Sequence, residues 1–242
     1  GGGLGGGGAF DLLTPNIQVM FRLGLQDTAA IDAGHWWRLV LPIFLHLGLL
    51  HVAFNCYLLH FAGQLLEADM GSRLLFTLYM VADLSGTIAS YVFDIGGAGA
   101  SGAVMGLLAA ILVRRRLLDG DFKHPLSQQL LFLIGINIVF GLFMGGRINH
   151  VAHGAGFLAG GLFMWLLSRR RIGRAGAATL LVGSTGIGVT VLAAFVLMTL
   201  SLFNGGPSDL MAASRCWQQV GLSVTPDFNP SVAEEAQRCL VD

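Results

Sequence analysis

The chain has 242 residues, of which 54% are hydrophobic and only 12% are charged. An ordinary soluble domain is about 25% charged, so this composition argues against a soluble globular protein. The 14 basic and 14 acidic residues give a net charge of +0, which provides no electrostatic attraction for nucleic acid. Glycine contributes 35 residues, and glycine is frequent where membrane helices pack closely. We therefore expect an all-α integral membrane protein that contacts the lipid bilayer and has no nucleic-acid partner.

Six segments of the chain are predicted to be transmembrane helices. A membrane helix needs about 18 or more apolar residues. Five segments near or above this length contain no Asp, Glu, Lys or Arg, namely 39–66, 95–113, 125–146, 148–168 and 175–208. A sixth span is expected at 73–94, where Asp83 interrupts the apolar run, because one polar residue does not prevent insertion. The glycine-rich start, Gly1–Phe10, is too short to span a bilayer.

The basic residues between the spans predict the orientation of the chain. Nine of them fall on one side: Arg73, Arg114, Arg115, Arg116, Lys123, Arg169, Arg170, Arg171 and Arg174. The other side holds five: Arg22, Arg38, Arg147, Arg215 and Arg238. Basic residues concentrate in cytoplasmic loops. We therefore predict that 67–73, 114–124 and 169–175 are cytoplasmic and that 11–45 and 204–242 are extracytoplasmic.

Polar residues inside the apolar segments are costly to bury, so they mark candidate functional positions. The first group is His46, His51 and Asn55. His51 and Asn55 are four residues apart and share a helix face, where both can donate hydrogen bonds into one cavity. The alternative is that each side chain satisfies the backbone of a neighbouring helix. His60 falls on the opposite face and is interpreted as structural.

The second group surrounds Ser101, which lies between Gly99 and Gly102 at the start of a span. A serine in this place can simply cap a helix. The functional alternative is that the glycines expose its hydroxyl and let backbone N–H groups approach a developing oxyanion. No strand is expected before Ser101, which excludes the nucleophile turn of the α/β-hydrolases.

The third group is His150 and His153, at the outer end of another span. Gly156 and Gly160 follow as a GxxxG pair, which favours close approach to a neighbouring helix. Such an approach would bring an imidazole to the Ser101 hydroxyl, and a serine needs an adjacent base to become a nucleophile. A single histidine in this position would more often be a hydrogen-bonded core residue.

Taken together, these residues resemble the rhomboid family of intramembrane serine proteases in type, order and spacing. The resemblance covers about 36–168. It rests on Trp37, Arg38, His46, His51, Asn55, Glu67, the GASG sequence around Ser101 and the AHGAG sequence around His153. It implies a rhomboid-like helical bundle that hydrolyses peptide bonds inside the membrane. The implied substrates are single-span transmembrane proteins.

The resemblance also implies a role for each matched residue. Ser101 would be the nucleophile and His153 the general base, acting as a dyad without a third acid. The side chains of His51 and Asn55 and the backbone N–H of Ser101 would form the oxyanion hole. The matched residues in the outer loop, His46, Trp37 and Arg38, would be structural, and Glu67 would hold the cytoplasmic end of its helix. No metal or cofactor is implied.

The chain departs from the family pattern in two places. The residue four positions after the serine, often aromatic in the family, is Met105. The first family helix is expected to be missing or reduced to Gly1–Phe10. The predicted organisation is a leader and start of the outer loop (1–38), a rhomboid catalytic core (39–175), an extra C-terminal transmembrane helix (176–203) and an extracytoplasmic tail (204–242). The expected location is the inner cell membrane, with the active site facing the extracytoplasmic side.

Two other classes of function remain open from the sequence. One is a catalytically inactive rhomboid-like protein that binds membrane clients, although the presence of Ser101 and His153 argues against it. The other is a metal or haem protein that uses His46, His51, His150 and His153, since imidazole is a common metal ligand. No carboxylate or thiolate completes such a site. Asp83, the one acid deep in a span, is expected to be neutral or hydrogen-bonded rather than catalytic.

The cysteines lead to a prediction about the tail. We expect Cys216 and Cys239 to form a disulfide and Cys56 to be a free, buried thiol, because disulfides persist outside the cytoplasm. The bridge would enclose 22 residues and stabilise the tail by about 3 kcal/mol. The alternative is a disordered tail with two thiols. Mass spectrometry after alkylation without reductant distinguishes the two, and labelling of both tail cysteines in protein from oxidising membranes would refute the bridge.

Overall fold

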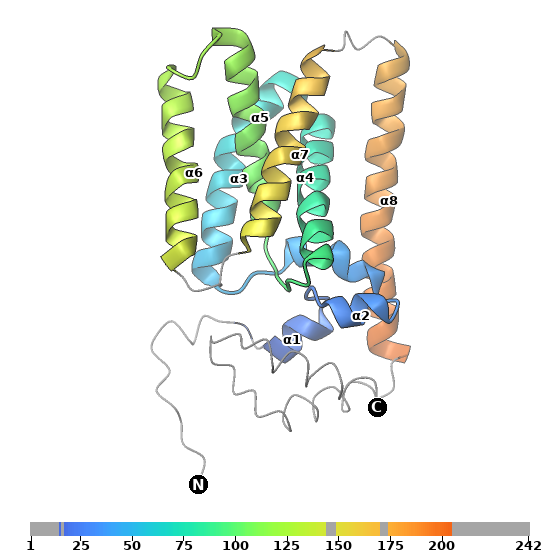
Figure 1. The fold of residues 1–242 in the computed structure, drawn as a ribbon. Coiled ribbons are helices and arrows are strands. Elements are labelled where there is room, and N and C mark those ends of the chain that lie inside the picture. Colours follow the sequence, from blue (N-terminus) through green and yellow to red (C-terminus); the bar gives the residue numbers. More distant parts are fainter. Residues whose placement is uncertain (1–14, 16, 144–148, 170–173, 205–242) are drawn as a thin grey trace.

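The computed structural model describes residue 15 and residues 17–143, 149–169 and 174–204. Within these ranges the regular structure is helical, apart from an isolated bridge between Gln26 and Gly97. Six long helices stand side by side as a bundle, and the shorter helices lie across one of its ends (Figure 1). The predicted all-α class is confirmed.

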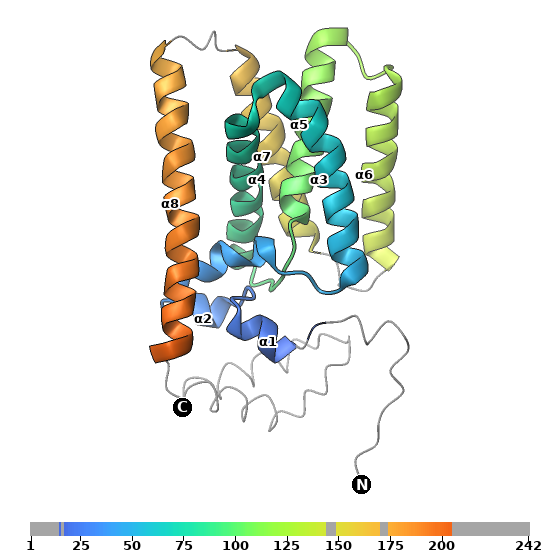
Figure 2. The same cartoon turned by 180° about the vertical axis from the view of Figure 1, so that it is seen from behind.

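The helices follow one another in a simple order along the chain. The short elements are α1 (Ile17–Arg22), α2 (Thr28–Asp32) and the 3₁₀ helices η2 (Trp36–Leu39) and η3 (Leu41–Phe44). The long helices are α3 (Leu49–Met70), α4 (Ser72–Val92), α5 (Ser101–Asp119), α6 (Pro125–Phe143), α7 (His150–Arg169) and α8 (Arg174–Asn204). Seen from behind, α8 stands at one side of the bundle and α6 at the other (Figure 2).

Each long helix overlaps one of the six predicted spans. Within the described part of the chain, four helical segments are long and apolar enough to cross a membrane by length and composition alone: α3, α4, α7 and the 182–202 part of α8. A shorter apolar helical segment, Pro125–Val139, lies in α6. The helix α5 has three consecutive arginines, Arg114, Arg115 and Arg116, in its C-terminal part, and it packs inside the bundle.

Two of the predicted spans begin too early. The first was predicted from residue 39, but the chain there forms η2 and η3, and α3 starts at Leu49. Pro42 supplies no backbone donor for a continuous α-helix, and the backbone at Leu45 is extended. The second was predicted from residue 95, but α5 starts at Ser101, after a loop. A run without charged residues therefore marks an apolar segment, and not the bounds of its helix.

The core of the bundle forms around α5. Every residue from Gly102 to Leu112 is buried, because α3, α4, α6 and α7 all pack against this helix. Large apolar side chains on the outer helices are instead exposed, including Leu50, Tyr57, Phe132, Leu158, Val182 and Leu192. Exposed apolar surface on this scale suits contact with lipid. Cys56 belongs to this exposed surface: it is free, as predicted, but it is not buried.

The helices α5 and α7 approach each other through four glycines. A Cβ atom built on Gly156 would lie 2.2 Å from the carbonyl oxygen of Gly102, and one built on Gly160 would lie 2.2 Å from that of Gly106. These distances leave no room for any side chain. The two backbones therefore touch directly, as in small-residue interfaces of membrane helices.

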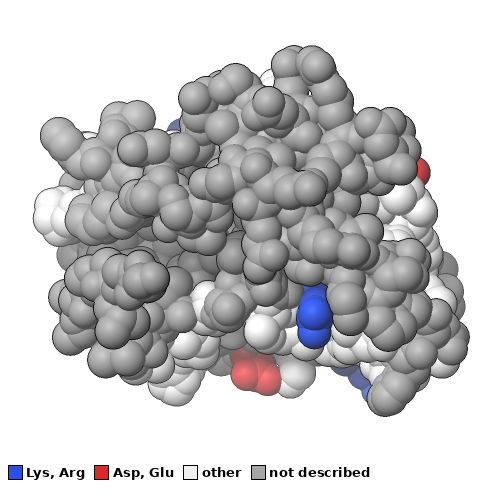
Figure 3. Space-filling view, turned by 90° about the horizontal axis from the view of Figure 1, so that it is seen from below, with Lys and Arg blue, Asp and Glu red and all other residues white. Residues whose placement is uncertain are grey.

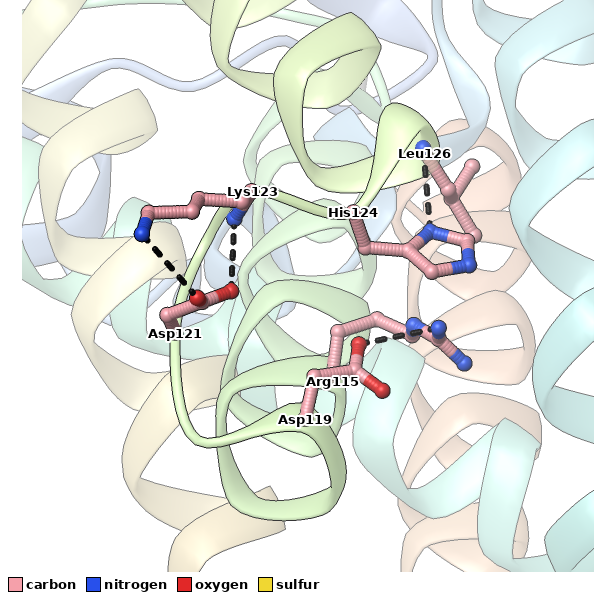
Figure 4. Close-up of polar contacts among 6 residues, drawn as sticks. All are labelled: Arg115, Asp119, Asp121, Lys123, His124 and Leu126. Carbon is pink, nitrogen blue, oxygen red and sulfur yellow. Dashed lines mark hydrogen bonds and ion pairs between the residues drawn. The ribbon is translucent and has the colours of Figure 1, made fainter.

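The connection between α5 and α6 is a compact polar turn (Figure 4). Arg115 pairs with Asp119 one turn later at 2.9 Å. Asp121 accepts a hydrogen bond from the backbone N–H of Lys123 at 2.8 Å, and Nδ1 of His124 accepts one from the N–H of Leu126 at 3.2 Å. The α3–α4 turn, the end of α7 and the start of α8 lie at this same end of the bundle (Figure 1).

The opposite end carries the outer segment that contains α1, α2, η2 and η3. The Arg38 guanidinium donates hydrogen bonds to the carbonyl oxygens of Phe21 and Leu25, both at 2.8 Å. It also lies 4.0 Å from the centre of the Phe21 ring. Burial lowers the pKa of Arg38 to about 10. This pKa is still well above neutral pH, so the side chain remains cationic. Seen from this end, the described surface shows isolated charged side chains among uncharged ones (Figure 3).

The predicted segment boundaries at residues 38, 175 and 203 stay predictions. Residues 205–242 lie outside the described residues. The bridge between Cys216 and Cys239 therefore also stays a prediction.

The glycine contact predicts a difference between two adjacent substitutions. Gly160→Ala would push a methyl group into the Gly106 backbone, and we expect it to destabilise the fold by about 1–3 kcal/mol and to lower the Tm. Gly161→Ala is the matched control, because a Cβ there meets Val113 at 3.6 Å and Ala109 at 3.7 Å, ordinary contact distances. Thermal unfolding in detergent measures both. Equal Tm values for the two variants would contradict the close packing.

Candidate active site

Ser101 is placed by the loop that leads into α5. The loop turns at Gly99, whose φ of +127° is a backbone conformation that favours glycine. The N–H of Gly99 donates to the carbonyl oxygen of Pro42 at 2.9 Å, which attaches the loop to the outer segment. Ser101 is the first residue of α5 and is half-buried. Its hydroxyl therefore stands at the N-terminal end of the central helix.

His153 is placed by the first turn of α7. Asn149 caps this helix, because its Oδ1 accepts a hydrogen bond from the N–H of Ala152 at 2.9 Å. The Nδ2 of the same side chain donates to Oγ of Ser90 on α4 at 2.8 Å. The start of α7 is thus held against α4 by a side chain four residues before His153. The His153 side chain is buried.

The close packing of α5 and α7 brings the two predicted residues together. Oγ of Ser101 lies 2.7 Å from Nε2 of His153, a hydrogen-bond distance. Nδ1 of His153 makes no hydrogen bond to any residue that the structure describes. The arrangement is therefore a serine and a histidine without a carboxylate on the second ring nitrogen. If Nε2 accepts the hydroxyl proton, the pair can form an activated nucleophile.

His51 and Asn55 lie next to the same loop. A Cβ atom built on Gly99 would be 2.8 Å from Nε2 of His51 and 3.7 Å from Nδ2 of Asn55. Nδ1 of His51 accepts a long hydrogen bond, 3.4 Å, from the N–H of Leu47, which leaves the proton of a neutral ring on Nε2. Asn55 is buried, and its Nδ2 has no hydrogen-bond partner among the described residues. Two donors thus converge on the backbone just before Ser101.

The other two histidines each lie beside one of these residues. The ring centres of His46 and His51 are 5.1 Å apart, and those of His150 and His153 are 6.3 Å apart, both pairs edge to face. The four histidines therefore make two ring contacts, one within each pair. Among the described residues, no group of three or more His, Cys, Asp or Glu could hold a metal ion.

Three other residues named from the sequence have different surroundings. His60 is exposed on α3. Glu67 accepts a hydrogen bond from the Ser72 hydroxyl and so joins the end of α3 to the start of α4. Met105 is buried within the apolar core.

Asp83 is hydrogen-bonded, as the sequence led us to expect, but sequence reasoning missed the row of polar contacts on α4 to which it belongs. Asp83, Thr87 and Ser90 are all buried. Asp83 accepts a hydrogen bond from the N–H of Ala103 at 3.0 Å, and the Thr87 hydroxyl donates to the carbonyl oxygen of Leu39 at 2.8 Å. The spacing of these residues, four and then three, places them on one helix face, and this spacing was the available signal.

A small cavity lies beside Ser101. Its volume is about 30 Å³, and Gln26, Asp83, Thr87 and Asn149 are among the residues that line it. Such a volume matches about one water molecule with polar neighbours. The polar face of α4 and the nucleophile candidate therefore share one polar environment.

The fold and the site define a class of protein: a polytopic helical membrane protein with a partly buried serine–histidine pair near one end of its bundle. The rhomboid domain model matches residues 33–170, and the chain belongs to the rhomboid family. It is an integral, multi-pass membrane protein, and the family contains intramembrane proteases as well as rhomboid-like proteins without that activity.

Curated relatives carry rhomboid names. Rhomboid protease GluP of Bacillus subtilis is 36% identical over 149 residues, which are 61% of this chain and 29% of that protein. RHOMBOID-like protein 5 of Arabidopsis thaliana is 34% identical over 157 residues, 62% of this chain and 50% of that protein. RHOMBOID-like protein 1 of the same plant is 33% identical over 165 residues, 64% and 41% respectively. The match spans half or less of each of these relatives.

Proposed function

We propose that this chain is an intramembrane serine endopeptidase that uses Ser101 and His153 as its catalytic dyad. The observation that carries the proposal is the 2.7 Å contact between Oγ of Ser101 and Nε2 of His153. Membership of a family that contains proteases supports the same conclusion. An inactive client-binding protein would have no need of this contact.

In the proposed first half-reaction, the Ser101 oxygen attacks the carbonyl carbon of the scissile peptide bond. His153 takes the hydroxyl proton at Nε2, and the carbonyl oxygen becomes an oxyanion. The carbon–nitrogen bond then breaks, and the imidazolium gives its proton to the leaving amine. The product is an acyl ester on Ser101 and a released peptide with a free amino terminus.

The second half-reaction releases the other fragment. His153 takes a proton from water, and the resulting hydroxide attacks the ester carbon. The tetrahedral intermediate collapses, the bond to the Ser101 oxygen breaks, and the proton returns to that oxygen. The products are a carboxylic acid and the regenerated dyad, so one water molecule is consumed for each bond cleaved.

The proposed oxyanion hole consists of the side chains of His51 and Asn55 and the backbone N–H of Ser101. The support is geometric, since both side chains lie against Gly99. The Asn55 Nδ2 donor is buried and has no partner among the described residues. Donors that are fixed before the charge develops stabilise it without reorganisation.

The proposed substrates are single-span transmembrane proteins in the same bilayer. The proposed location is the inner cell membrane, with the dyad facing the extracytoplasmic side. Ser101 and His153 lie at the starts of α5 and α7, whereas Arg116 and Arg169 lie near the ends of the same helices. Because basic residues favour the cytoplasmic side, the dyad is assigned to the opposite side.

Removal of the dyad tests the proposed activity. We expect Ser101→Ala and His153→Ala each to abolish cleavage of a transmembrane reporter by purified protein in liposomes. The double variant should be no worse than either single one, since the two groups act as a unit. An unchanged Tm confirms that each variant is folded. Wild-type turnover by Ser101→Ala would refute the assignment of the nucleophile.

His150→Ala is the matched control for the base. Its side chain lies one helical turn before His153 and contacts the ring of that residue edge to face. We expect a mild loss of activity. Complete inactivation equal to that of His153→Ala would show that the base is wrongly assigned.

The oxyanion donor gives a separate kinetic prediction. Asn55→Ala should lower kcat by about 10²–10³, because one oxyanion donor typically contributes that much, while KM changes little. Steady-state kinetics with the transmembrane reporter measures both constants. A variant with wild-type kcat and a raised KM would assign Asn55 to substrate positioning instead.

A further inference from the structure

We propose that Asp83 is a positioning residue for the reaction: it caps α5 from the side and thereby holds the Ser101 hydroxyl against His153. This inference rests on the proposed function. Asp83 lies on α4, twenty residues from its contact on α5, and is only 3% exposed.

The start of α5 has a particular hydrogen-bonding requirement. The first N–H groups of a helix have no partner within it. In α5 the first bond within the helix runs from the N–H of Val104 to the carbonyl oxygen of Ala100. The N–H groups of Ser101, Gly102 and Ala103 therefore need other partners, and the residue in the capping position, Ala100, has no side chain that can accept a hydrogen bond.

An ordinary cap would conflict with the proposed chemistry. A serine or aspartate at residue 100 would place its oxygen over the end of the helix, where the proposed oxyanion hole needs the Ser101 N–H. Asp83 avoids this conflict by approaching from the flank. Its Oδ1 accepts the N–H of Ala103 at 3.0 Å and would lie 3.2 Å from a Cβ atom on Gly102. The Ser101 N–H is thereby left for the substrate.

The contact fixes more than the end of one helix. The same helix, α4, also holds Asn149 at the start of α7 through Ser90. Both residues of the dyad are therefore positioned by contacts to the same helix, α4: Ser101 through Asp83, and His153 through Ser90. A loss of the Asp83 contact would let the start of α5 move relative to α7, and would lengthen the contact between Ser101 and His153.

The hydrogen-bond acceptor, and not a negative charge, is what the geometry requires. A negative charge beside the N-terminus of α5 would offset the favourable helix dipole and so weaken stabilisation of the oxyanion. Asp83→Asn keeps an oxygen in the same place for the Ala103 N–H. Asp83→Ala and Asp83→Leu both remove it, the first with a smaller side chain and the second with the same number and branching of side-chain heavy atoms.

The test compares these three variants by their kinetics and by the rate at which a fluorophosphonate labels Ser101. We expect Asp83→Ala and Asp83→Leu to lower kcat and the labelling rate about tenfold, in line with a lost buried hydrogen bond, with KM within twofold of wild type. Asp83→Asn should stay within twofold in all three quantities. The matched control is Thr77→Val, because Thr77 is also buried on α4 but its hydroxyl donates to the carbonyl oxygen of Arg73 within its own helix. It should leave kcat and labelling unchanged.

Each alternative result has a defined meaning. Wild-type rates in Asp83→Ala and Asp83→Leu would overturn the positioning role, and so would an equal loss in Thr77→Val. An Asp83→Asn variant as slow as Asp83→Ala would overturn the claim that the acceptor is what matters. If Ala and Leu prevent folding, Asp83→Ser replaces them, since its shorter side chain does not reach Ala103, and the same tenfold loss is expected.

The proposed function can fail separately from this inference. The positioning role alone would be overturned if wild-type protein is labelled at Ser101 and cleaves the reporter, and substitution of Asp83 changes neither rate. Wild-type protein that is folded but neither labels nor cleaves, under conditions that support a known rhomboid protease, would overturn both.

Discussion

The contact between the backbones of α5 and α7 is the constraint on which the rest of the structure depends. Gly156 lies on Gly102 and Gly160 lies on Gly106, with no space for a side chain in between. Ser101 is the residue directly before Gly102, and His153 lies three residues before Gly156. The spacing of the two backbones that carry Ser101 and His153 therefore depends on the packing of two helices, which is far stiffer than the rotamers of two isolated side chains. The contact that we propose to be catalytic thus depends on small residues that have no chemistry of their own.

The helix α4 provides the frame against which both of these helices are aligned. Its apolar faces pack in the core, while its buried polar face makes contacts with three other parts of the chain, through Asp83, Thr87 and Ser90. Buried hydrogen bonds of this kind are directional, so they fix register and rotation where apolar packing alone would permit sliding. The outer segment is attached to the same face through Thr87. The bundle thus combines non-directional packing with a small number of oriented polar contacts.

Much of this arrangement could be predicted from the sequence, for identifiable reasons. Five of the six helices were recognisable because uncharged runs of this length seldom occur outside membrane helices, and the sixth because a single acid does not prevent insertion. The meeting of Ser101 with His153 followed from a family resemblance and a GxxxG pattern. The helix starts at Leu49 and Ser101 were missed because absence of charge does not distinguish a helix from an apolar loop. The partner of Asp83 was not predictable, because the sequence does not indicate which backbone N–H on another helix will meet its carboxyl group. The exposure of Cys56 was missed because lipid-facing and core-facing positions have similar composition.

Nδ1 of His153 has no hydrogen-bond partner among the residues that the structure describes, and this has a consequence for how charge is distributed in a membrane. A triad would keep a carboxylate against the imidazole at all times and would bear the desolvation cost of that ion in every resting molecule. In the proposed dyad, serine and histidine are both neutral at rest. Positive and negative charge appear together, on the imidazolium and the oxyanion, only while a substrate is being converted. Opposite charges created a few ångströms apart in a low-dielectric setting attract each other strongly, so the site ionises as a transient dipole and carries no permanent ion on its base.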